Sequence, residues 1–204
     1  MNTEMDKVSY IIGRQIGADF KKQGIEINFE HFSQGARSAF LGEESDISAE
    51  DTNTIMTGFQ AKMQEQMMRM QNEIGEKNQA EGAAFLEENK KRKGVEVTDS
   101  GLQFLKLESG SGKTPTENDK VEVHYEGTLV DGTVFDSSYQ RGETITFPVN
   151  AVIPGWTEAL QLMKEGDIFE LAIPSNLAYG AQGAGNTITP HSTLKFKVEL
   201  KKVL

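Results

Sequence analysis

Proline is confined to the second part of the chain, and this distribution constrains the fold more than any other feature of the sequence. All five prolines lie between Pro115 and Pro190. Proline breaks helices because it has no backbone N–H and its ring clashes with the preceding turn. The residues before Gly94 are therefore free to form long helices, whereas most clusters of β-branched residues, which favour strands, come after it. The sequence predicts a helical half followed by a sheet half.

Two short helices are expected at the start of the chain. Thr3 with Asp6 forms a capping pair ahead of apolar residues at helical spacing, and Gly24 supplies a stop. Asn28 is suited to cap a second helix, which Gly42 ends. Each helix has one apolar face that must be covered.

A much longer helix is expected over residues 48–93, because no proline interrupts them. About 45 helical residues span roughly 65–70 Å, which is too long for one compact domain. Its apolar, methionine-rich stripe runs from Ile55 to Ile74 and then fades, so we expect the first half to pack and the second half to stand in water. Gly75 and Gly82 each weaken the helix by about 1 kcal/mol relative to alanine and are candidate bend positions.

Two short helices alone bury too little surface to be stable. With no cysteine and three histidines, disulfides and thiolate metal sites are not available to stabilise them. We therefore predict a homodimer through a helical dimerisation domain, residues 1–47, followed by a connecting helix, residues 48–94. The alternative is a monomer in which the long helix breaks near Gly75 and folds back. Methionines are adaptable in packing, so the stripe is also a candidate surface for holding unfolded client chains.

The third predicted domain, residues 95–204, shows the alternation of strands. Asp131-Gly132 is a strong hairpin signal. Consecutive strands with one brief helix predict an α+β domain, an antiparallel sheet wrapped around a short helix. Strands are expected over residues 102–108, 120–125, 133–135, 145–149, 167–174 and 194–203, and the helix over 156–163.

Composition and the chain start exclude several classes of function. A net charge of −10 and a pI near 4.9 disfavour nucleic acid as a partner. No apolar stretch approaches the roughly 20 residues that span a membrane, so no membrane partner is expected. The acidic, polar start lacks the pattern of an export signal. We therefore expect a cytoplasmic protein, or a periplasmic one if a leader was removed before this numbering begins.

Motifs for nucleophilic, phosphate and metal chemistry are absent from the sequence. The glycine-rich run 180–185 leads into a strand, so it is not followed by a helix N-terminus that could bind a phosphate or another anion. We interpret it as a flexible loop. His124 and His191 have no carboxylate at metal-ligand spacing and are interpreted as structural. No metal and no cofactor is expected.

Aromatic residues gather in the second half of the chain, where a hydrophobic core is their ordinary explanation. Three groups stand beside turn signals, and one of them contains a lone acid. These contexts predict the mouth of a pocket at Phe135-Asp136-Ser137-Ser138, Val152-Ile153-Pro154-Gly155-Trp156 and Ala178-Tyr179-Gly180.

Five motifs in register carry a family resemblance. They are Val123-His124-Tyr125-x-Gly127, Asp131-Gly132-Thr133-x-Phe135-Asp136-Ser137-Ser138, Val152-Ile153-Pro154-Gly155-Trp156, Leu177-Ala178-Tyr179-Gly180 and Pro190-His191-Ser192-Thr193-Leu194-x-Phe196. Together they closely resemble the FKBP-type peptidyl-prolyl cis-trans isomerases. The helical first half is similar to the dimeric bacterial subgroup that includes the macrophage infectivity potentiator proteins.

The resemblance implies a proline-binding pocket and roles for its residues. Trp156 would form the floor under the proline ring. The Ile153 backbone N–H and the Tyr179 hydroxyl would donate hydrogen bonds to ligand carbonyls, and Asp136 would face the twisting amide. The implied catalytic residues are Tyr125, Asp136, Ile153 and Tyr179, and the implied substrate-binding residues are Phe135, Arg141, Ile145, Phe147, Val152, Trp156, Ile188 and Phe196.

The implied function is a rotamase that accelerates proline-limited folding without covalent chemistry, while the helical domain holds unfolded clients. Thr187 and Thr189 depart from the family pattern, since isoleucine and proline are usual there, and they predict a more polar, looser loop over the pocket. Macrolides of the tacrolimus type are implied as inhibitors, with an affinity that this loop leaves open. Two other functions remain: a holdase whose pocket only binds, and a virulence adhesin by analogy with the subgroup.

Overall fold

The computed structural model describes residues 2–204, which form two compact units. The first ends at Lys62 and the second spans Met63–Leu204, so the division falls inside the long helix α3, Ala49–Asn89. The boundaries expected after residues 47 and 94 stay predictions. Within residues 2–204, no helix combines the length and the apolar character that crossing a membrane requires.

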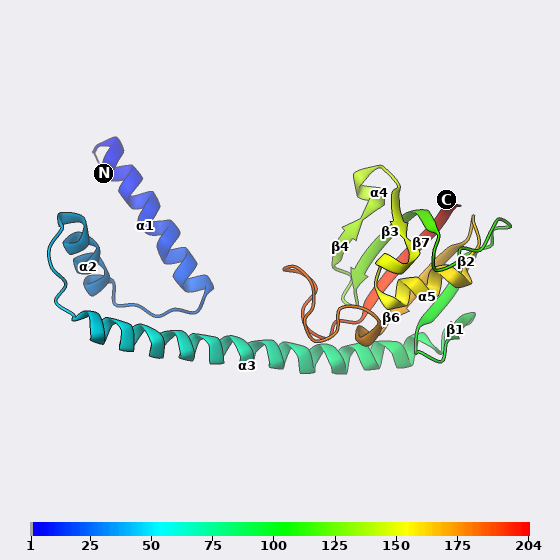
Figure 1. Ribbon diagram of the computed structural model, residues 1–204, viewed down its shortest axis with the longest axis horizontal. Coiled ribbons are helices and arrows are strands. Elements are labelled where there is room, and N and C mark those ends of the chain that lie inside the picture. The colour runs from blue at the N-terminus through cyan, green and yellow to red at the C-terminus, as the bar shows by residue number, and fades with distance from the viewer. Residues whose placement is uncertain (1) are drawn as a thin grey trace. The chain divides into compact units, whose positions relative to one another are not determined.

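The first unit contains α1 (Glu4–Lys22), α2 (Phe29–Leu41) and the beginning of α3 (Figure 1). The predicted caps are confirmed. Thr3 and Asp6 form a capping box, and the Asn28 side chain accepts hydrogen bonds from the first turn of α2. Gly42 ends α2 in the left-handed region, with φ of 70°, which glycine adopts without steric cost.

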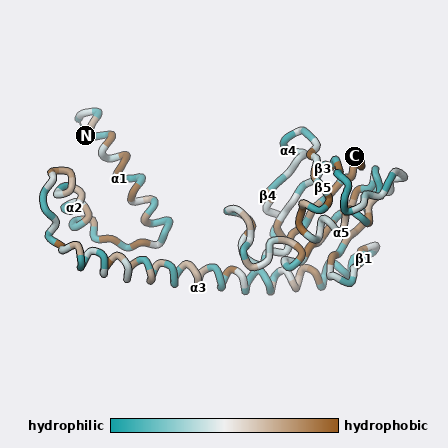
Figure 2. Tube along the Cα trace, in the orientation of Figure 1, coloured by the Kyte–Doolittle hydropathy of each residue, from teal (hydrophilic) through white to brown (hydrophobic). Residues whose placement is uncertain are grey.

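Apolar side chains of the first unit are largely uncovered. Neither α1 nor α2, both fully described, contains a buried residue. Ile11 is 53 % exposed and Phe40 is 90 % exposed, and along these helices apolar and polar residues alternate (Figure 2). A single copy of this unit therefore leaves its apolar faces in contact with water.

The second unit is built on a seven-stranded antiparallel sheet with the order β1-β2-β6-β7-β3-β4, in which β5 also pairs with β3. The short helix α5 (Pro154–Leu162) contributes Trp156, Ala159 and Leu160 to the core. This confirms the predicted α+β class. The strands are β1 (Val95–Val97), β2 (Gln103–Glu108), β3 (Lys120–Leu129), β4 (Val134–Ser137), β5 (Ile145–Pro148), β6 (Ile168–Ile173) and β7 (Leu194–Val203).

Three kinds of element were not predicted from the sequence. They are the short strand β1, the single-turn helix α4 (Ser138–Arg141) and the 3-10 turns η1 (Val149–Ala151) and η2 (Ser175–Leu177). Each is four residues or shorter, so it carries too few residues to show a periodicity. The longer elements agree with the predicted ones to within a few residues at their ends.

One face of the second half of α3 is covered, and this corrects the expectation that this half stands in water. Gly75, Gly82 and Asn89 are buried within the second unit. Asn89 Nδ2 donates to Gln103 Oε1 at 2.9 Å, and Gln103 Nε2 donates to the Leu86 carbonyl at 3.0 Å. The helix is continuous through Gly75, so the break required by the folded-back monomer is absent from the described chain. Gly75 and Gly82 allow close packing, because a residue without a side chain leaves space for the neighbouring loop to approach the helix backbone.

Candidate active site

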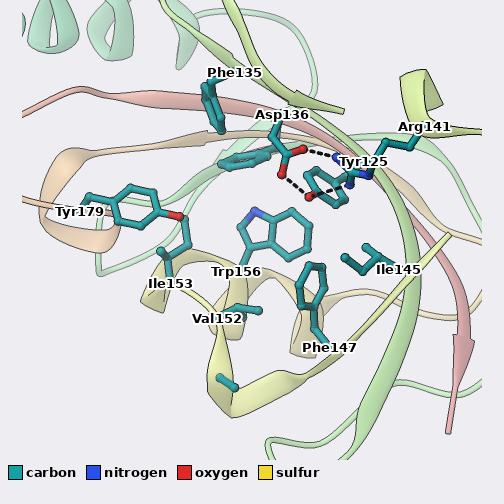
Figure 3. A pocket seen from close by; sticks show the side chains of 12 residues that line it. Tyr125, Phe135, Asp136, Arg141, Ile145, Phe147, Val152, Ile153, Trp156 and Tyr179 are labelled. Atoms are coloured by element: carbon teal, nitrogen blue, oxygen red, sulfur yellow. Dashed lines mark hydrogen bonds and ion pairs between the residues drawn. The ribbon is translucent and has the colours of Figure 1, made fainter. Parts of the chain in front are cut away.

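One cavity of about 690 Å³ opens beside α5 (Figure 3). It gathers side chains from seven elements and two connecting segments, because β3, β4, β5 and β7 are neighbours in the sheet and the start of α5 faces them. The lining residues are Tyr125, Phe135, Asp136, Arg141, Ile145, Phe147, Ala151, Val152, Ile153, Trp156, Tyr179 and Phe196.

Aromatic rings form the inner part of the cavity around Trp156, which is 4 % exposed. The indole meets Tyr125 and Phe196 edge to face, with centroid distances of 5.2 and 5.3 Å, and Phe147 lies 5.9 Å away. Such T-shaped contacts are preferred by aromatic quadrupoles and fix the orientation of each ring. The buried indole Nε1 has no acceptor among residues 2–204. The result is a rigid apolar pocket.

Gly127 makes room for two of these rings. It lies on β3, and a Cβ atom there would stand 2.6 Å from the Phe135 ring and 2.7 Å from the Phe196 ring. Phe135 and Phe196 pack edge to face at 5.5 Å directly over this position. Any larger residue at position 127 would displace them.

A polar network occupies one side of the cavity. The Tyr125 hydroxyl and the Arg141 guanidinium both donate to the Asp136 carboxylate, and Arg141 also donates to the Tyr125 hydroxyl oxygen at 3.2 Å. The sheet places these residues together, because Tyr125 and Asp136 lie on the paired strands β3 and β4. Arg141 ends α4, which the Ser137 side chain caps. The carboxylate is thereby held at the pocket edge with both oxygens engaged.

The network keeps Asp136 ionised and Tyr125 protonated. Burial by itself would raise the pKa of Asp136, but hydrogen bonds from Tyr125 and Arg141, together with the positive charge of Arg141, outweigh it and hold the pKa below its ordinary value. The pKa of the Tyr125 phenol is raised, first by burial and then by its hydrogen bond to Asp136. A fixed negative charge and a fixed donor therefore face each other at neutral pH.

Comparisons with known proteins identify the family. Residues 111–201 match the family described as FKBP-type peptidyl-prolyl cis-trans isomerase, and residues 5–105 match the domain amino terminal to it. The chain belongs to the FKBP-type peptidyl-prolyl isomerases. The resemblance noted from the five motifs is confirmed, and so is the assignment as a peptidyl-prolyl isomerase.

The relatives of this FKBP-type isomerase match it over nearly its whole length. It is 42 % identical to Outer membrane protein MIP of Legionella longbeachae over 203 residues, which is 100 % of this chain and 87 % of the relative. It is 43 % identical to the FKBP-type 22 kDa peptidyl-prolyl cis-trans isomerase of Escherichia coli over 199 residues, covering 97 % and 95 %. The crystal structure of FkpA from Escherichia coli superposes with a TM-score of 0.79 at 35 % identity, covering 100 % of this chain and 98 % of that one.

Eleven of the twelve site residues expected from the sequence line the cavity of this isomerase. Ile188 does not: it is 8 % exposed, packs in the core and pairs with Ala184 in an isolated bridge. Ala151, at the end of η1, lines the cavity instead and was missed, because a small residue in an unpredicted turn gives no sequence signal. The individual roles of the residues stay predictions.

The two histidines interpreted as structural have protein neighbours. His124 Nδ1 lies 2.9 Å from Ser138 Oγ, and its ring stacks on Tyr139 at 4.6 Å. His191 packs against Gly75 of α3. Within residues 2–204, no group of three or more histidines and carboxylates is arranged to hold a metal ion.

Proposed function

We propose that the cavity around Trp156 is the site where this isomerase binds proline and turns the prolyl bond. The observation that carries the proposal is the floor of Trp156, enclosed by the rings of Tyr125 and Phe196 and bordered by one carboxylate. A pyrrolidine ring is compact and apolar, so it suits a dry aromatic pocket of about 690 Å³ with space left for flanking backbone.

The chemistry requires only rotation about the C–N bond. The barrier of about 18–20 kcal/mol arises from amide resonance, and each tenfold acceleration requires lowering it by about 1.4 kcal/mol. Twisting removes the resonance, so the carbonyl loses negative charge and the nitrogen becomes more basic. An apolar pocket favours the twisted state, because the planar amide has the larger dipole and loses more on leaving water.

The polar edge orients the amide. Asp136 presents a negative charge that is already satisfied by Tyr125 and Arg141, so it acts electrostatically and needs no proton transfer. Tyr179 lies at the mouth, 41 % exposed, and its hydroxyl points toward Ile153 in Figure 3. The Tyr179 hydroxyl and the Ile153 backbone N–H are the proposed hydrogen-bond donors to the substrate carbonyls.

Protease-coupled peptide isomerisation tests the site. Asp136→Ala and Trp156→Leu are each expected to lower kcat/KM by at least tenfold, because the first removes the charge that faces the amide and the second removes the floor under the proline ring. Glu143→Ala, which removes an exposed carboxylate, is the matched control and should leave activity unchanged. Unchanged turnover in both site variants would refute the assignment of this cavity as the isomerase site. A wild-type chain that binds proline peptides without turning them over would favour the holdase.

The uncovered faces of α1 and α2 support a homodimer formed by the first unit. Residues such as Ile11 and Phe40 would be buried in a second copy, which relieves the apolar exposure of an unpaired unit. Sedimentation of the full chain should give twice the mass of the 22.5 kDa chain. A monomer at micromolar concentration would refute this arrangement.

Holding of unfolded clients is the proposed role of the first unit beside the isomerase pockets. Tethering raises the local concentration of client near the pocket. Full-length chain and residues 63–204 should turn over short peptides equally, while only the full chain accelerates refolding of an unfolded protein strongly. Trp156 fluorescence checks that the shortened chain is folded. Equal activity of both chains on both substrates would refute client holding.

The comparisons do not support the cytoplasmic location expected from the sequence. The relative named Outer membrane protein MIP supports the alternative location, the periplasm, which is our proposal. Cell fractionation with a periplasmic marker tests it. The aromatic cavity also supports binding of a tacrolimus-type macrolide, which should compete with peptide in the turnover assay if it enters the same pocket.

A further inference from the structure

The segment 179–193 connects the mouth of the cavity to β7 and is held by its own backbone. Tyr179 lines the cavity at one end. The Ala184 N–H donates to the Ile188 carbonyl at 2.7 Å, which closes a small hairpin-like turn. The His191 N–H donates to the Gly180 carbonyl at 2.8 Å. The backbone at His191 is thereby tied to the residue that follows Tyr179.

The connecting helix α3 binds the far end of this segment. Asn78 Nδ2 donates to Thr189 Oγ1 and to the Pro190 carbonyl, both at 2.7 Å, and lies 3.4 Å from Ser192 Oγ. Asn78 is half-buried in this contact. Thr189, which the sequence suggested would loosen the loop, supplies one of the acceptors.

Two glycines on the same face of α3 let the segment approach closely. A Cβ atom on Gly75 would lie 3.0 Å from His191 Cδ2, and one on Gly82 would lie 2.3 Å from Thr193 Oγ1. Residues 75, 78 and 82 lie on one side of a helix with 3.6 residues per turn. The face of α3 that contacts residues 189–193 therefore consists of Gly75, the hydrogen-bonding side-chain amide of Asn78, and Gly82.

We propose that Asn78 is a positioning residue that sets the substrate preference of the isomerase by placing Tyr179. The path is short and continuous: Asn78 holds Pro190, the next residue His191 holds Gly180, and Gly180 follows Tyr179. Tyr179 lines the cavity and is 41 % exposed, so it borders the opening through which the chain flanking the proposed proline would enter. A shift of segment 179–193 would change the space for the substrate side chains that flank proline more than it would change the pocket floor at Trp156. The inference rests on the proposed function of the cavity.

The experiment uses the full chain and a series of short peptides that differ in the residue before proline. Asn78→Ala should change the ratio of kcat/KM between peptides with bulky and small residues there by about threefold to tenfold, mainly through KM, as expected for one lost hydrogen-bonding group. Thr189→Val keeps the side-chain shape, removes one acceptor and should give a smaller change in the same direction. Gln66→Ala, which removes an exposed amide from the same helix, is the control and should change nothing.

Amide hydrogen exchange supplies a readout independent of turnover. The His191 amide should exchange about threefold to tenfold faster in Asn78→Ala than in the wild type, because its bond to Gly180 loses support. An unchanged exchange rate would overturn the proposal, as would an equal loss of kcat/KM for all peptides. No turnover in the wild type would instead refute the isomerase site itself, on which this inference rests, so the two failures are distinguishable.

Discussion

Gly82 of α3 offers a test in which helix propensity and tertiary packing predict opposite signs. In a helix interior, alanine is more favourable than glycine by about 1 kcal/mol, so Gly82→Ala should stabilise the protein if the helix surface were free. In the structure the added methyl group would lie 2.3 Å from Thr193 Oγ1 and 3.1 Å from Thr193 Cβ. Thr193 is 6 % exposed and has little space into which to move.

The two effects determine the expected magnitude. Overpacking a close contact costs about 1–3 kcal/mol, which exceeds the propensity gain. We expect Gly82→Ala to lower the free energy of unfolding by up to about 2 kcal/mol, from the difference between these two ranges. In a Thr193→Ala background the oxygen at 2.3 Å is gone, and the remaining contacts are Cβ at 3.1 Å and the backbone nitrogen at 3.9 Å, so the same substitution should be neutral or stabilising.

Urea unfolding followed by the fluorescence of Trp156 measures this directly. The chain contains one tryptophan, and it is buried in the second unit, so its signal reports the unit against which α3 packs. The four proteins of the cycle are compared at one concentration, because association shifts the apparent stability. If Gly82→Ala raises the free energy of unfolding by about 1 kcal/mol in both backgrounds, α3 does not dock on Thr193, and the reasoning is refuted.

Two further predictions concern the site. The value of kcat/KM should be constant between about pH 5 and pH 8. It should fall only as the pH drops through the pKa of Asp136, which lies below the ordinary value of about 3.9, because the native network needs the ionised carboxylate. A pH-jump peptide assay in which kcat/KM already fell above pH 5 would contradict this. Gly127→Ala should lower kcat/KM at least tenfold, because the methyl group displaces the rings of Phe135 and Phe196. Circular dichroism checks that the variant is folded. Full activity in the folded variant would show that those rings do not shape the binding site.

Local signals were enough to place the helices of the first unit. Thr3 and Asn28 cap α1 and α2 as expected, and Gly42 ends α2, because capping depends on residues within one turn of each other. The hairpin at Asp131-Gly132 and the strand β7 likewise follow from patterns of a few residues. The short elements β1 and α4 escaped prediction because each has four residues or fewer, which is too few to show a periodicity.

The candidate site was available from the sequence only through its motifs. Turn signals stood beside Asp136, Trp156 and Tyr179, but they did not show that these residues meet in one site. The pairing of β3 with β4 brings Tyr125 and Asp136 together, and α4 brings Arg141 to both. Ile188 stands among the family's pocket residues by position, yet it does not line the cavity here. Such distinctions depend on side-chain direction, which position along a motif does not encode.

The sequence alone determined where the longer helices and strands form, because capping, proline placement and hydrophobic periodicity act over a few residues. The tertiary structure decided which faces meet. Gly75, Asn78 and Gly82 are a weak, polar stretch of helix when read in sequence order, and they become a docking face because the segment 189–193, more than a hundred residues away, supplies matching acceptors and close contacts. Complementarity between two surfaces is a property of the pair, so neither segment specifies it by itself.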